Sequence, residues 1–142
     1  VFIPFSDDGL KLMKSEFDRI HPVDDIGGGP VLFFPLNSKF ITAPYLRLPE
    51  NERSFFLGLL RRADPPTQER ITEQIVDNES LYQRILGVGG VRYLPDTLPE
   101  NADFWRHHFG TLWPELMNFK SRFDPDGVLV GSFGEYLVSS RD

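Results

Sequence analysis

The stretch that decides the fold is "PVLFFPLN", residues 30–37, followed closely by "RSFFLGLLRR", residues 53–62. Both are short, nearly continuous apolar runs, which is typical of buried strands, although so short a run as 53–62 could also be a buried helix. The segment between them, "FITAPYLRLP" (40–49), alternates imperfectly and contains Pro44, which favours an irregular or edge strand. We therefore predict that successive strands are joined here by short connections in a mostly antiparallel sheet.

Helical patterns lie on both sides of these strands. Leu10, Met13, Phe17 and Ile20 recur at helical spacing after the capping residues Ser6 and Asp7. In chain order we predict strand 1–4, helix 7–20, strands 30–37, 40–49 and 53–62, helix 66–86, strand 91–95, and helices 101–109 and 114–123. This order predicts one α+β domain over residues 1–142, with a mostly antiparallel sheet and helices packed on one face.

The apolar positions of these elements predict the core. We expect eight residues to be nearly buried: Phe17, Leu32, Phe34, Phe56, Ile71, Ile75, Ile85 and Leu116. An antiparallel sheet with helices on one side leaves its second face to water or to a partner. If the strands are apolar on both sides, we expect that second face to bind a partner or a ligand.

Composition excludes several classes of function. The net charge is −6, and no run of lysine or arginine exceeds a pair, which argues against a nucleic-acid partner. Cysteine is absent, so disulfides and thiolate chemistry are excluded. No apolar run approaches the roughly 20 residues of a membrane span. The chain opens within a strand pattern and without Met, so we expect it to be part of a longer protein.

The polar residues do not form a catalytic set by spacing. His107 and His108 are adjacent, so they point about 100° apart on a helix and cannot bind one metal ion. The carboxylates gather in caps and turns, and no nucleophile elbow is present. The glycine clusters do not connect a strand to a helix as a phosphate-binding loop does. The residues alone thus predict a domain that forms one wall of a binding site and has no catalytic residue and no metal site of its own.

The order of motifs resembles the C-terminal part of the cytokinin dehydrogenases, FAD-linked enzymes of the vanillyl-alcohol-oxidase type. The resemblance lies in "PVLFFPLN", "RSFFLGLLRRAD" and "YLP", and then in "FWRHHFG" followed by "WPELMNFKSRFDPDGVL". It covers nearly all 142 residues. One departure is clear: where the family closes on Pro-Gly-Gln, this chain has "VGSFGEYL" at 130–137.

The resemblance implies a function and a site. It implies the substrate-binding part of an FAD-dependent amine dehydrogenase acting on cytokinin-like N6-prenyl adenines, with the FAD-binding domain in an N-terminal region outside this chain. Tyr93 and Gly58 would approach the flavin. Leu94, Leu60 and Asn37 would bind the substrate.

The resemblance also implies that the packet Trp105, His108, Phe109 and Gly110 serves in packing. Two alternatives stay open: a flavin oxidase acting on an alcohol or a hydroxy acid, and a non-catalytic α+β binding module.

Overall fold

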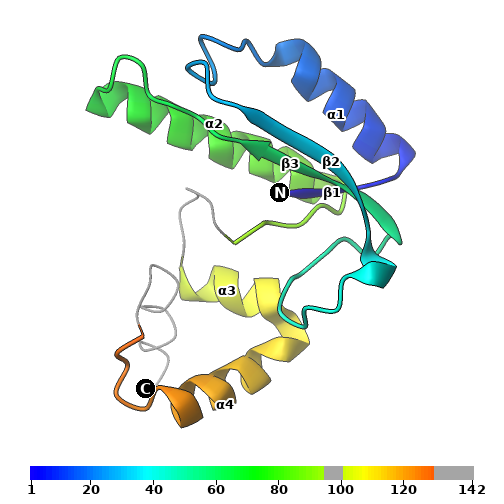
Figure 1. Ribbon diagram of the computed structural model, residues 1–142, viewed down its shortest axis with the longest axis vertical. Helices are drawn as coiled ribbons and strands as arrows, with labels where there is room; N and C mark the ends of the chain where they lie inside the picture. The colour runs from blue at the N-terminus through cyan, green and yellow to red at the C-terminus, as the bar shows by residue number, and fades with distance from the viewer. Residues whose placement is uncertain (95–100, 130–142) are drawn as a thin grey trace. The chain divides into compact units, whose positions relative to one another are not determined.

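The computed structural model describes residues 1–94 and 101–129. Contacts divide the chain into two compact units, Val1–Leu98 and Pro99–Asp142. Figure 1 shows that the first unit contains the sheet with α1 and α2, and that the second contains α3 and α4.

The sheet of the first unit is antiparallel and has β3 at its centre. Its strands are β1 (Phe2–Pro4), β2 (Val31–Asn37) and β3 (Arg53–Leu59), in the order β1-β3-β2. Phe56 of β3 lies opposite Phe2 on one side and Phe34 on the other. The predicted α+β class with an antiparallel sheet is confirmed.

Two helices cover one face of this sheet. Helix α1 (Asp7–Arg19) begins where the Ser6 hydroxyl accepts the Gly9 N–H, and α2 (Gln68–Gly87) begins where Thr67 accepts the Arg70 N–H in the same way. Their buried side chains join those of the strands in one cluster: Ile3, Met13, Leu57, Leu81 and Ile85. The helix-covered face therefore holds the core of the first unit.

Strand pairing assigns the remaining side chains to the second face, because directly opposed residues of antiparallel strands point the same way and successive residues alternate. Phe2 and Phe56 form one such pair, and Leu32 and Gly58 form another. We call this second surface the aromatic face, and it consists of Phe2, Leu32, Phe34, Phe56, Gly58 and Tyr93.

The second unit is built from α3 (Ala102–Phe109) and α4 (Trp113–Phe123), joined by a 3-10 turn. Asn101 caps α3 by accepting the Phe104 N–H at 2.8 Å. Trp105, His108 and Phe109 are buried, and their rings contact one another. Gly110 ends the helix with a φ of 50°, a conformation that favours glycine. The burial and mutual contacts of these rings are those expected of packing.

Two predicted strands are wrong: one does not form, and the other is reduced to a single bridge. Residues 40–49 form no strand. Instead, a 3-10 turn, Ser38–Phe40, follows β2, and Asn37 accepts the Lys39 N–H at 3.0 Å to cap it. Residues 91–94 make only one bridge, between Val91 and Phe2. Prolines at 44, 49 and 95 remove backbone donors from these segments, which explains why the apolar pattern does not extend the sheet.

Most of the predicted core is also wrong. Phe56 and Ile85 are buried, but Phe17, Leu32, Phe34 and Ile71 are 40 to 44% exposed. Ile75 and Leu116 are half-buried. The apolar period does mark the strand, but β2 is an edge strand, so its side chains lack a neighbouring strand on one side. For Leu32 and Phe34, burial thus depends on the strand order, which the apolar pattern does not contain.

Candidate functional site

Three aromatic rings form the centre of the aromatic face. Tyr93 lies with its ring centroid 5.2 Å from that of Phe56 and 5.6 Å from that of Phe2, and the interplanar angles are 89° and 82°. The two phenylalanine rings lie 5.5 Å apart. Phe2 and Phe56 are buried and Tyr93 is half-buried. Such edge-to-face contacts are the favoured geometry of aromatic pairs.

An exposed apolar margin borders these rings on β2. Phe34 stacks on Phe56 at 4.8 Å, and Leu32 lies opposite Gly58. A Cβ atom on Gly58 would meet the Phe56 ring at 3.0 Å and the Leu32 Cβ at 3.4 Å. Glycine thus lets the Phe56 ring and Leu32 pack closely over the backbone at this position. Partly exposed apolar and aromatic side chains are the usual lining of a site for a flat ligand.

The structure brings together two of the predicted site residues directly. Gly58 and Tyr93 both neighbour the Phe56 ring. Leu60 lies two residues beyond Gly58, is half exposed, and donates its N–H to the Pro30 carbonyl. Leu94 follows Tyr93 and is half-buried. Gly58 and Tyr93 are thus linked through the Phe56 ring, and Leu60 and Leu94 are close to them in the chain.

Asn37 lies elsewhere in the sheet. It is paired with Arg53, five residues along β3 from Gly58, or about 17 Å at the usual rise of a strand. Strand alternation also places it on the opposite face from Gly58. Its amide group caps the Lys39 N–H and approaches Glu52. The structure does not bring Asn37 together with the other predicted residues.

Phe2 and Phe56 were not among the predicted site residues. The available signal was the pairing of "VFIP" with "RSFFLGL", in which an aromatic side chain stands on each strand. Register cannot be assigned from either stretch alone, because a slip of one residue would move every side chain to the other face.

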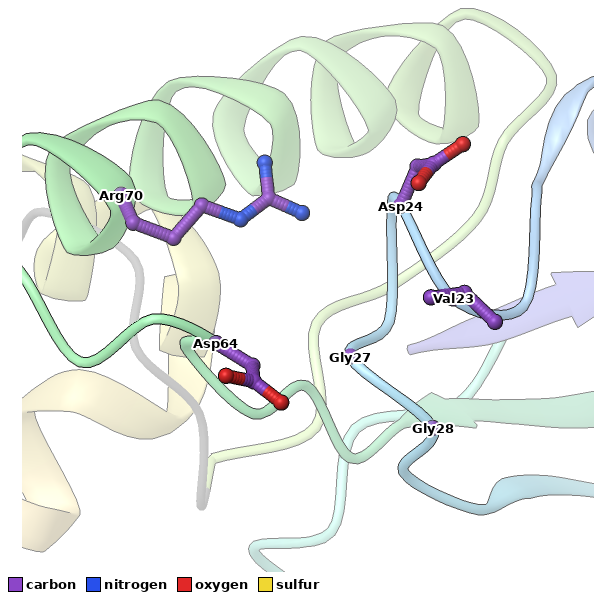
Figure 2. A pocket seen from close by; sticks show the side chains of 6 residues that line it. All are labelled: Val23, Asp24, Gly27, Gly28, Asp64 and Arg70. Carbon is purple, nitrogen blue, oxygen red and sulfur yellow. The ribbon is translucent and has the colours of Figure 1, made fainter.

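A polar depression of about 310 Å³ lies beside the ends of β2 and β3, apart from these residues. Figure 2 shows Arg70 reaching from α2 toward the loop that carries Asp24, with Asp64 nearby. Gly27 and Gly28 form its wall. Arg70 already pairs with Glu73 at 3.2 Å, and Asp24 pairs with His21 at 3.0 Å. The depression contains none of the predicted site residues.

Two glycines of this loop, Gly27 and Gly29, are explained by close packing. A Cβ atom on Gly29 would lie 1.8 Å from the Leu60 carbonyl oxygen, and one on Gly27 would lie 2.0 Å from that of Arg62. The loop is thereby held against the chain that follows β3. We attribute these glycines to this contact and not to a ligand.

The titratable groups with shifted pKa values lie among the helices and loops. Burial would raise the pKa of Glu16, but hydrogen bonds from Arg84 and Arg19 outweigh it and lower that pKa. Arg84 Nε donates to Glu16 Oε1 at 2.6 Å, which links α2 to α1. Burial lowers the pKa of Arg61, which donates to the Asp25 carbonyl at 2.7 Å. In the second unit, the pKa of Asp124 is lowered by Lys120 and by the Val128 and Leu129 N–H groups. These groups are placed to stabilise helices and turns.

Two further properties concern the described residues alone. Within 1–94 and 101–129, His, Asp and Glu side chains form no group of three that could hold a metal ion. None of the helices in this part of the chain is both long enough and apolar enough to cross a membrane.

Comparison with known proteins identifies the family. Residues 2–134 match the family described as "Cytokinin dehydrogenase 1, FAD and cytokinin binding". The chain belongs to the cytokinin dehydrogenase family. Among its relatives, cytokinin dehydrogenase 6 of Oryza sativa subsp. japonica is 31% identical over 151 aligned residues, covering 99% of this chain. An uncharacterized oxidoreductase of the fasciation locus of Rhodococcoides fascians is 34% identical over 111 residues, 78% of this chain.

The chain spans about a quarter of the length of these relatives, 26% of the rice protein and 25% of the bacterial one. Its matched region is the one to which the cytokinin dehydrogenase family description assigns FAD and cytokinin binding. The segment 130–137, where the sequence departs from the family pattern, lies outside the described residues.

Proposed function

We propose that this chain is the substrate-binding part of an FAD-dependent oxidoreductase that oxidises the C–N side chain of cytokinin-like N6-prenyl adenines. The observation that carries the proposal is the family match over residues 2–134. The aromatic face supports it, because it offers aromatic and partly exposed apolar side chains in the matched region.

Tyr93 and Gly58 are the proposed flavin contacts. Gly58 lies closely beneath the Phe56 ring and Leu32, which a Cβ atom would meet at 3.0 and 3.4 Å, and the same Phe56 ring contacts Tyr93. Tyr93 adds a phenol to an otherwise apolar cluster. Aromatic and apolar side chains of this kind suit a planar cofactor.

Leu94 and Leu60 are the proposed substrate contacts. Both side chains are aliphatic. Leu94 directly follows Tyr93, and Leu60 directly follows the end of β3. Such side chains bind a prenyl tail or a flat base by removing apolar surface from water. Asn37 is the least favoured of the proposed contacts, because its amide group is already used at the end of β2.

The protein's contribution to the reaction is orientation and exclusion of water. When bound, FAD would supply the oxidant by accepting a hydride from the C–H bond beside the substrate nitrogen. The apolar side chains would hold the reacting carbon in place and keep water from it. We also propose that both units belong to one substrate region over residues 1–142, and that another part of the enzyme supplies the FAD-binding domain.

Flavin bleaching tests the proposal. The full-length protein should be purified with its flavin, made anaerobic, and mixed with isopentenyladenine while visible absorption is followed. We expect rapid loss of the oxidised flavin band with isopentenyladenine and none with simple alcohols. A protein that retains flavin but responds only to an alcohol or a hydroxy acid would contradict the substrate class. A protein that binds no flavin would contradict the enzyme assignment.

A further inference from the structure

We infer that Phe2 and Phe56 act together as positioning residues that fix the plane of the Tyr93 ring on the aromatic face. The inference rests on the proposed function, in which Tyr93 contacts the flavin. It adds two residues whose role is exerted through Tyr93 and not on the substrate.

The angles between the three rings carry the inference. The Tyr93 ring stands at 82° to Phe2 and at 89° to Phe56, close to perpendicular to both. The two phenylalanine rings are themselves inclined by 57°. A plane that is perpendicular to two inclined planes can have only one orientation. Either phenylalanine alone would leave the tyrosine ring free to rotate about one axis, whereas the pair removes that freedom.

The two phenylalanines are anchored more firmly than Tyr93. They are directly paired residues of neighbouring strands, both are buried, and Phe56 is backed by the stacked Phe34 ring. The backbone next to Tyr93 is joined to the sheet by the Val91–Phe2 bridge, with N···O distances of 2.7 and 2.8 Å, and Tyr93 itself is half-buried. The paired strands thus hold the two phenylalanine rings in place, and the contacts of these rings restrict the orientation of the Tyr93 ring.

Leucine substitutions test this role with little change in volume. In the full-length flavoprotein we would compare Phe56→Leu and Phe2→Leu with Tyr93→Phe and with the double variant Phe56→Leu/Tyr93→Phe. Phe55→Leu is the matched control. Phe55 directly precedes Phe56 in β3, lies on the helix-covered face, and its ring contacts Phe5 and Phe33.

Three measurements separate positioning from simple loss of stability: flavin fluorescence, the rate of flavin reduction by isopentenyladenine, and thermal unfolding. Tyrosine beside a flavin quenches its fluorescence, so a displaced ring changes the signal without turnover. We expect Phe56→Leu and Phe2→Leu to change the fluorescence in the same direction as Tyr93→Phe. We also expect each to slow reduction about 2- to 10-fold, the scale of one aromatic contact. The KM for isopentenyladenine should change less.

The double variant decides the mechanism. If Phe56 acts by orienting the ring that carries the Tyr93 hydroxyl, Phe56→Leu will add nothing to the Tyr93→Phe effect on reduction, because that hydroxyl is already absent. If the effects of Phe56→Leu and Tyr93→Phe on reduction multiply, the inference is overturned. It is also overturned if Phe55→Leu slows reduction as much as Phe56→Leu does. If Tyr93→Phe itself leaves fluorescence and reduction unchanged, the proposed flavin contact of Tyr93 is wrong. A normal Tyr93→Phe response with unaffected Phe56→Leu and Phe2→Leu variants overturns only the positioning role.

Discussion

The two faces of the sheet use the same strand for different purposes. On the helix-covered face, β3 contributes Leu57, which packs with Ile3 and Ile85 in an aliphatic cluster that water does not reach. On the aromatic face, the neighbouring positions Phe56 and Gly58 provide a ring that contacts Tyr93 and a glycine that packs closely beneath that ring. Because successive side chains of a strand alternate, one short segment can serve both faces without conflict. Stability should therefore depend on one set of β3 positions and ligand binding on the other.

The largest expected effect lies on the helix-covered face. Ile85→Ala should lower the free energy of unfolding by about 2–5 kcal/mol, because it leaves a cavity in a fully buried cluster. Leu86→Ala is the control, since Leu86 is the next residue of α2 and is 42% exposed. Urea denaturation of the purified protein measures both. Similar losses at the two positions would show that the helix face has been assigned wrongly.

The corresponding substitution beside the aromatic face should alter selectivity. Leu94→Ala in the full-length enzyme should change the preference between prenyl adenines that differ by one methylene about 10- to 200-fold, the range for an apolar contact of that size. The measurement is kcat/KM for each substrate. Flavin content and thermal stability should stay near those of the unmodified enzyme. If stability falls and kcat/KM per folded molecule does not change, Leu94 is a packing residue and the difference between the faces disappears.

A smaller effect is expected where the two covering helices meet. Glu16 is buried and accepts from Arg84 and Arg19, but both arginines are partly exposed, so solvent screens the attraction. Glu16→Gln should cost about 1–2 kcal/mol of unfolding free energy at pH 7, below the value for a fully buried pair.

The pH dependence gives this prediction its sign. The pKa of Glu16 is lowered in the folded protein from its ordinary value of 4.5. Its contribution is therefore present above pH 4.5 and is lost as the pH falls through the folded pKa. Unfolding measured between pH 7 and pH 3 should show the unmodified protein losing more stability than Glu16→Gln. Parallel pH curves would show that the carboxylate is not stabilised by these partners.

The sequence predicted the helices but not the exposure of the edge strand, and the difference has a physical reason. Helical spacing predicted α1, α2, α3 and α4, because each helix carries its period and its capping signals locally. The exposure of Phe34 was missed, because it depends on β2 being an edge strand. The contact of Tyr93 with Phe2 joins residues 91 positions apart in the chain, and no local pattern encodes it.

Recognition of the site residues had the same limit. The family motifs indicated Tyr93, Gly58, Leu60 and Leu94, and the structure links Tyr93 and Gly58 through the Phe56 ring. Asn37 is separated from Gly58 because strand register sets its position, and a motif does not specify register. The roles of these residues with flavin and substrate remain predictions, which substitutions of Tyr93, Leu94 and Gly58 address.

The smallest effect on stability, and the sharpest test of the comparison, is expected at Gly58. Gly58→Ala would place a methyl group 3.0 Å from the tip of the Phe56 ring and 3.4 Å from the Leu32 Cβ, so the ring must shift by a few tenths of an ångström. Alanine also reduces the freedom of the unfolded chain, which offsets this cost, so unfolding should change by no more than about 1 kcal/mol. If the aromatic face holds the flavin, the added methyl group displaces the Phe56 ring that contacts Tyr93 and should slow flavin reduction or reduce flavin content well beyond that small change. Gly87→Ala is the control, because a Cβ atom there meets nothing within 4 Å. Unchanged flavin content and reduction in Gly58→Ala would mean that no ligand depends on the packing at Gly58, and the aromatic face would then be packing like the helix-covered one.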